Sequence, residues 1–281
     1  MIINMKKIKV KNERLVFTIL IIALFILFLL YYNFIFSTVF ARNSFANEMI
    51  ELADENENSI FNIQKILLYS SANAIDNSQN HSLKNMSICQ YTDLSIYLDN
   101  ISHISDLTDE NTIKELYIDS IVMTSASDVG SKILNYKNPL DFGKYKNIQE
   151  PTNGRIDFNI VNTNSENESN DYSTPTFYTD CSNPITLGYL NKDILTNYSV
   201  SQDTSTVSFN GKVLKEANIN LNDINYNLSF KIHIVNNLNQ KFVYNMNLSV
   251  DLNDENGGIY NGYIFKGKNT SGNEFRFFKE F

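Results

Sequence analysis

Cysteine, histidine and tryptophan are scarce in this chain of 281 residues, which holds two cysteines, three histidines and no tryptophan. Two cysteines cannot build a disulfide-dense scaffold or a cysteine-rich metal module. The histidines, His81, His103 and His233, form no short-spaced pair of the kind that a helical zinc site requires. The composition therefore indicates no metal and no cofactor.

Positive charge is also in deficit, with 23 basic against 31 acidic side chains and a net charge of -8. An acidic surface repels backbone phosphates, so we expect no nucleic-acid partner. Hydrophobic residues make up 43% of the chain, which is enough for a packed core and excludes wholesale disorder.

Charged residues are missing altogether from Leu15 to Phe36. A helix of about 22 residues is roughly 33 Å long, enough to cross the hydrocarbon core of a bilayer. We therefore predict a transmembrane helix at residues 15–40, in contact with membrane lipid. Val39, Phe40 and Ala41 resemble a signal-peptidase site, but the apolar run is longer than that of a signal peptide, which favours an uncleaved anchor.

The charges on either side of this segment predict its orientation. The tail at 1–14 is rich in lysine, and acidic residues from Glu48 to Glu57 follow the apolar run. By the positive-inside rule the tail is cytoplasmic, and everything after about residue 40 is extracytoplasmic. The predicted location is the cell membrane.

Glycine and proline are absent from the first part of the chain, up to Gly130 and Pro139 respectively. These residues interrupt helices, so their absence favours a helical region at 41–124. Apolar residues there recur at helical spacing, as in Phe45, Met49 and Leu52. Further examples are Ile60, Ile63 and Leu67; Leu94, Tyr97, Ile101 and Ile104; and Ile113, Leu116 and Tyr117. Residues 125–175 contain several glycines and prolines and are predicted as a turn-rich connection.

The period changes to two in residues 176–281. Leu228, Phe230 and Ile232 alternate with polar residues, and Tyr244, Met246 and Leu248 do the same after a polar loop, which predicts a β-hairpin. A second hairpin is predicted around Asn210-Gly211, between Val207 and Val213. About seven such strands fit an antiparallel β-sandwich of immunoglobulin-like size. The predicted fold class is thus α+β: a transmembrane helix, an extracytoplasmic helical segment and a C-terminal sandwich.

Motifs that carry chemistry are weak. Residues Gly262 to Lys268 match most of a phosphate-binding loop, but Asn269 replaces the Ser or Thr that binds magnesium. Asp251 to Gly258 is rich in oxygen side chains, yet Asn256 stands where a calcium loop needs glycine. The carboxylates Asp93, Asp99 and Asp180 lie among apolar residues and are the first candidates for a carboxylate pair, although a cap, turn or salt bridge is the favoured explanation of each.

Two further features leave alternatives open. Cys89 and Cys181 are a candidate disulfide, since both fall on the oxidising side of the membrane, but two buried free thiols are the alternative. Asn197, Asn227 and Asn247 begin Asn-x-Ser/Thr triplets, which are glycan acceptors only in a eukaryotic secretory route. The high content of Asn, Ile and Lys is typical of an AT-rich genome, in which such triplets arise incidentally.

Two functions are compatible with these features. The first is a single-pass, membrane-anchored extracytoplasmic protein of a bacterium that acts by binding or assembly. It would be an accessory or structural component of an envelope machine, or an adhesion-type module, with protein partners in the envelope. The alternative is a membrane-anchored hydrolase of cell-wall polymers that uses a carboxylate pair, which needs two carboxyl groups facing each other across a cleft.

Overall fold

The structure is a computed structural model, and it describes residues 14–32, 41–47, 60–76, 84–100, 108–137, 150–162, 174–200, 210–253, 257–270 and 275–280. The chain divides into two compact units, Met1–Glu55 and Asn56–Phe281.

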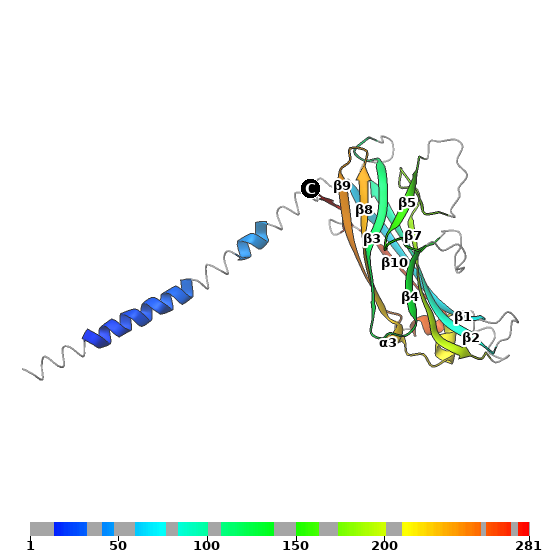
Figure 1. The fold of residues 1–281 in the computed structure, drawn as a ribbon, viewed down its shortest axis with the longest axis horizontal. Helices are drawn as coiled ribbons and strands as arrows, with labels where there is room; N and C mark the ends of the chain where they lie inside the picture. Colours follow the sequence, from blue (N-terminus) through cyan, green and yellow to red (C-terminus); the bar gives the residue numbers. More distant parts are fainter. Residues whose placement is uncertain are drawn as a thin grey trace, which may run out of the picture. The chain divides into compact units, whose positions relative to one another are not determined.

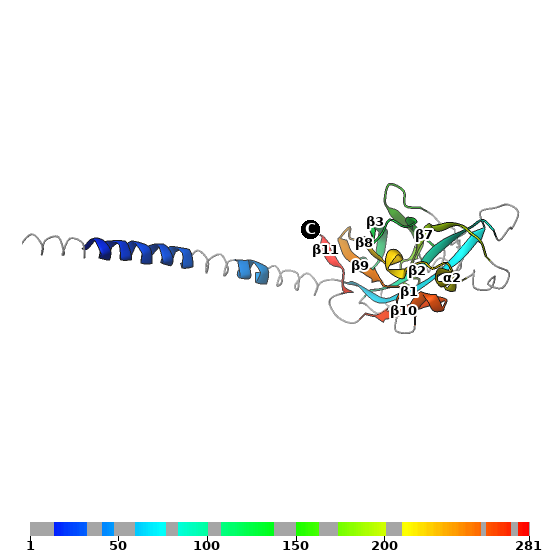
Figure 2. The ribbon, with the colours of Figure 1, turned by 90° about the horizontal axis from the view of Figure 1, so that it is seen from below.

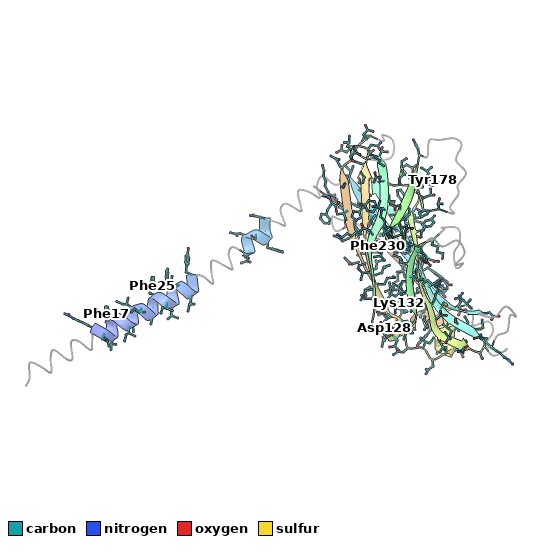
Figure 3. All side chains as sticks on the ribbon, viewed as in Figure 1. Phe17, Phe25, Asp128, Lys132, Tyr178 and Phe230 are labelled. Carbon is teal, nitrogen blue, oxygen red and sulfur yellow. The ribbon has the colours of Figure 1, made fainter. Side chains whose placement is uncertain are left out.

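The first unit contains an apolar helix at Arg14–Tyr32, long enough by length and composition to cross a membrane. Its side chains, including Phe17 and Phe25, project outward from the helix and are exposed (Figure 3). The prediction of an N-terminal apolar helix is therefore confirmed. A short second helix occupies residues 41–47, whereas Val39 and Phe40 lie outside the described residues.

The second unit is built from two β-sheets that pack face to face (Figures 1 and 2). The five-stranded sheet has the order β10-β1-β2-β7-β4 and the six-stranded sheet the order β11-β9-β8-β3-β5-β6. Neighbouring strands pair antiparallel, except β5 and β6, which are parallel. The strands of the first sheet are β10 (Tyr263–Asn269), β1 (Phe61–Asp76), β2 (Met86–Asn100), β7 (Ile185–Tyr198) and β4 (Ser131–Tyr136). Those of the second are β11 (Phe278–Glu280), β9 (Lys241–Val250), β8 (Tyr226–Asn236), β3 (Ile113–Ser125), β5 (Ile156–Val161) and β6 (Thr176–Tyr178).

The core fills the space between the two sheets, where Figure 3 labels Phe230. Of the residues predicted for the centre, Leu228, Phe230, Ile232 and Met246 are buried, and Tyr244 and Leu248 are half-buried against the same cluster. A stacked pair, Tyr189 and Tyr226, joins the sheets with ring centroids 3.7 Å apart. The β8–β9 hairpin is confirmed, with Phe230 paired to Met246 and Ile232 to Tyr244.

The predicted helical region at 41–124 is wrong over most of its described part. Residues Phe61–Asp76, Met86–Asn100 and Ile113–Ser125 are long strands, and the first two pair along their whole length. The absence of glycine and proline is therefore a property of long strands here, not of helices. Alternate side chains of β1 (Ile66, Leu68, Ser70 and Ala72) are buried, which is the period of two that a strand requires.

The second predicted hairpin is also wrong where the structure describes it. Lys212–Glu216 form a short helix, α2, and the Asn210 side chain accepts a hydrogen bond from the Lys212 N–H at 3.0 Å. Gly211 packs against the 3-10 helix η2 (Gly258–Asn261), where a Cβ atom would lie 2.3 Å from the Ile259 carbonyl oxygen. Asn210-Gly211 thus begins a short helix at a point where the backbone of Gly211 lies close to the backbone of η2. A second short helix, α3 (Leu221–Ile224), leads into β8.

The sandwich runs from Phe61 to Glu280 and does not begin at residue 176. Each sheet combines strands from both sides of that position: β10 and β7 flank β1 and β2, and β8 pairs with β3. The described residues beyond 60 are therefore mostly β-sheet with a few short helices, so the coarse prediction of a β-sandwich is confirmed and the helical segment is not.

Candidate functional site

The outer face of the five-stranded sheet carries a row of aromatic side chains from three strands. Tyr91 of β2, Tyr69 of β1 and Tyr263 of β10 follow one another, with ring centroids 6.3 Å and 5.5 Å apart. Phe265 continues the row along β10, because it is the cross-strand partner of Tyr69. These four residues are called the aromatic row below. They face outward because their strand neighbours Leu68, Ser70 and Ile264 are buried.

Exposure increases along the aromatic row towards the sheet edge. Tyr91 is 6% exposed, whereas Tyr263 and Phe265 are 59% and 61% exposed. Strand β10 pairs only with β1 among the described residues, so its other edge offers backbone N–H and C=O groups to a partner. Two aromatic rings at such exposure on a free edge are typical of a recognition surface.

The Tyr91 hydroxyl of the aromatic row stays uncharged at neutral pH. Burial, with smaller contributions from Asp93 and Tyr69, outweighs the hydrogen bond with Ser71 and raises the pKa of Tyr91 to about 12. A neutral phenol offers an apolar ring and one hydrogen-bonding hydroxyl, which suits binding by contact.

The candidate carboxylates fall into two places. Asp93, on the same outer face as the aromatic row, forms a buried ion pair with Lys137. Asp99 and Asp180 both lie near Cys181. Burial, followed by the negative charges of these two residues, raises the pKa of that thiol to about 12. Asp180 also accepts a hydrogen bond from the Ser182 N–H at 3.0 Å, as a turn residue does. The structure thus brings Asp99 and Asp180 to one region and places Asp93 in another.

The two cysteines are not brought together. Both are free, and Cys89 is buried in a small cluster with Tyr91 and Leu190. Cys181 packs instead against the main core, beside Asp99. Asp99 is ten residues further along β2 than Cys89, a distance of roughly 33 Å along a strand. A disulfide needs Cα atoms within about 7 Å, so this conformation keeps the two thiols separate.

The remaining motifs have structural explanations. His233 is 9% exposed, because its ring stacks on Tyr117 with centroids 4.5 Å apart and its Nε2 lies 3.1 Å from the Asp119 carboxylate. The segment resembling a phosphate-binding loop is strand β10, not a loop that opens a helix. His81, His103 and Asp254 to Asn256 lie outside the described residues.

The start of the calcium-like segment borders a polar hollow of about 300 Å³ at the ends of β3, β8 and β9. The Asp251 carboxylate oxygen there accepts hydrogen bonds from Asn225 and Asn253, and those from Asn253 contribute most to lowering its pKa. The Asp251 Oδ1 is therefore already hydrogen-bonded to the protein's own N–H groups and is not directed at a cation. Among the described residues no group of three or more His, Cys, Asp or Glu side chains could hold a metal ion.

The Asn-x-Ser/Thr triplets lie on exposed strand positions at Asn197, Asn227 and Asn247. Asn197 has a positive φ of 58° and sits near the end of β7, whereas the other two are within β8 and β9. Their exposure is compatible with either interpretation of these triplets.

No protein-family model matches the chain, and neither a curated protein nor a solved structure shows significant similarity to it. The candidate site therefore depends on geometry alone. Sequence reasoning singled out Asp93 but missed its partner Lys137 and the aromatic row. The available signal was the alternation in Tyr263-Ile-Phe265, where two aromatic residues flank one buried position.

Proposed function

We propose that this is a single-pass membrane protein whose β-sandwich acts outside the cytoplasm by binding a partner in the cell envelope, as an accessory component of an assembly or an adhesion-type module. The observation that supports it most directly is the exposure of Tyr263 and Phe265 on the edge strand of an otherwise well-packed sheet. A partner that extended the sheet, or lay over its outer face, would bury both rings.

The location in this proposal depends on the N-terminal helix Arg14–Tyr32 and on the charges that flank it. A reporter fused after Phe281 should be active only outside the cytoplasm, because lysine-rich tails remain inside. Cytoplasmic activity of the reporter would contradict the orientation. A mature protein that begins at Arg42 would show that the helix is a cleaved signal sequence.

The binding surface can be tested by site-specific photocrosslinking in intact cells. A photoreactive amino acid at Phe265 should give one adduct of defined mass, and the adduct should disappear when Tyr263 is also changed to Ser. Val122 is the matched control, since it is a 52% exposed apolar residue on the other sheet. Equal labelling from both positions, or none from Phe265, would contradict a specific surface at β10.

The alternative function, a cell-wall polymer hydrolase, has one observation in its favour. Asp99 and Asp180 both influence the pKa of Cys181, so two carboxylates share one region of the sandwich. If they form a catalytic pair, purified protein should release soluble fragments from cell walls, and Asp99→Asn or Asp180→Asn should abolish this release. Unchanged activity in both variants, or no activity in the parent protein, would remove this alternative.

A further inference from the structure

One ion pair lies beneath the surface of the outer face of the five-stranded sheet, away from its rim. The side chains of Lys137 and Asp93 are only 5% and 8% exposed, and the Lys137 Nζ is in direct contact with the Asp93 Oδ1. Lys137 follows β4 and is anchored to β7, because its N–H donates to the Thr186 carbonyl at 3.2 Å and its own carbonyl accepts from the Thr186 hydroxyl at 2.5 Å.

The path between the two side chains is open because a glycine lies below it. Strand β7 separates β2 from β4, and Gly188 of β7 pairs with Asp93 on one side and with Asn135 on the other. The aliphatic part of Lys137 crosses β7 at this point, so a Cβ atom at Gly188 would lie 3.4 Å from the Lys137 Cδ. Two strand spacings of about 4.8 Å each are within the combined reach of a lysine and an aspartate.

Burial changes the chemistry of this pair. The Lys137 amine and the Asp93 carboxyl group face each other in direct contact and are shielded from water. These are the two reactants of amide condensation. We propose that Lys137 and Asp93 become joined by an intramolecular isopeptide bond that ties β2 to the residue after β4 across β7.

The bond forms with the loss of one water molecule. The Lys137 ammonium first gives one proton to the Asp93 carboxylate, and the lone pair of the neutral Nζ attacks the Asp93 Cγ. The Nζ–Cγ bond forms, a second proton moves from Nζ to the carboxyl hydroxyl, and the Cγ–O bond breaks to release water. The product is a secondary amide, and nothing is oxidised or reduced.

The surroundings favour this step. Groups held in contact at a fixed geometry react with effective molarities on the order of 10⁵–10⁸ M, so the nearness of the pair replaces chemical activation. Neither cysteine provides a covalent tie in this structure, so the amide would be the cross-link of the sandwich.

The test is the intact mass of the full-length chain purified in detergent. We expect the parent protein to be lighter than its sequence predicts by the mass of one water molecule. Lys137→Arg keeps the positive charge, but a guanidinium is too weak a nucleophile to be acylated. The mass of this variant should therefore equal the mass that its own sequence predicts. Trypsin should not cleave after Lys137 in the parent protein, and a branched peptide should contain both Lys137 and Asp93.

Two results would overturn the proposal. The first is a parent protein of full mass that trypsin cleaves after Lys137, since the pair is then an ordinary salt bridge. The second is loss of one water in Lys137→Arg as well, since the dehydration then lies elsewhere in the chain. Because the parent protein alone distinguishes the linked from the unlinked form, the result does not depend on how well the variant folds.

Discussion

Phe230 and Ile232 of β8 point into the space between the sheets, and Lys231 between them points to solvent. Truncating either apolar residue to Ala should lower the free energy of unfolding by about 2–5 kcal/mol, through lost burial and the cavity left behind. Lys231→Ala should change it by less than about 0.5 kcal/mol. Chemical denaturation of the three variants measures both effects, and similar losses at all three positions would contradict the assigned faces of β8.

Tyrosines make the stability of the sandwich sensitive to alkaline pH. Burial raises the pKa of Tyr91 to about 12, and it raises the pKa of Tyr189 and Tyr226 as well. A folded pKa above the unfolded value of about 10 means that the stabilisation is complete below pH 10 and is lost as pH rises through the folded pKa.

The free energy of unfolding should therefore fall between pH 10 and about 12 for the contribution of Tyr91. Urea denaturation across this range should show a shallower decline for Tyr91→Phe than for the parent protein, because that variant has one phenol fewer to ionise. Lysines that lose their charge in the same range affect both proteins equally, so the difference between the two curves isolates Tyr91. Parallel curves would show that Tyr91 ionises freely in the folded state.

At the scale of single elements, strand β1 shows why the first part of the sandwich resembles helices in sequence. Its inward face includes Ser70, which is fully buried, donates a hydrogen bond to the Tyr91 carbonyl and accepts one from Thr92. A polar residue at a core position hides the period of two, while Ile60, Ile63 and Leu67 happen to fit a helical spacing. The β8–β9 hairpin could be predicted because its inward positions are apolar throughout.

Strand β1 also offers a direct test of the two periods. In the strand, Leu68 is 8% exposed and faces the core, whereas Leu67 faces outward and is half-buried. Leu68→Ala should therefore cost about 2–5 kcal/mol, and Leu67→Ala clearly less. Thermal or urea denaturation decides the order, and a larger cost at Leu67 would favour the helical register of Ile63 and Leu67.

At the scale of the whole molecule, the topology depends on pairings that local patterns do not specify. Strand β10 pairs with β1, so Tyr263 lies opposite Ser71, and β3 pairs with β8 in the other sheet. Periodicity can indicate that a segment is a strand and which residues share a face, but it does not say which strand lies beside it. The aromatic row and the Lys137–Asp93 pair each combine distant segments, so both required the structure.

This topology changes the expectation for the fragment 176–281. It contains β10 and β7 but lacks β1 and β2, which lie between them, and it contains β8 without its neighbour β3. The core faces of β7 and β8 would then be partly exposed, so we expect this fragment to be unfolded, with no cooperative transition in circular dichroism. A fragment of residues 56–281, which spans the whole compact unit, should give a β-type spectrum and unfold cooperatively. A folded 176–281 fragment would instead support the sequence-based boundary, and it would mean that the strands before residue 176 are added to a core that is already complete.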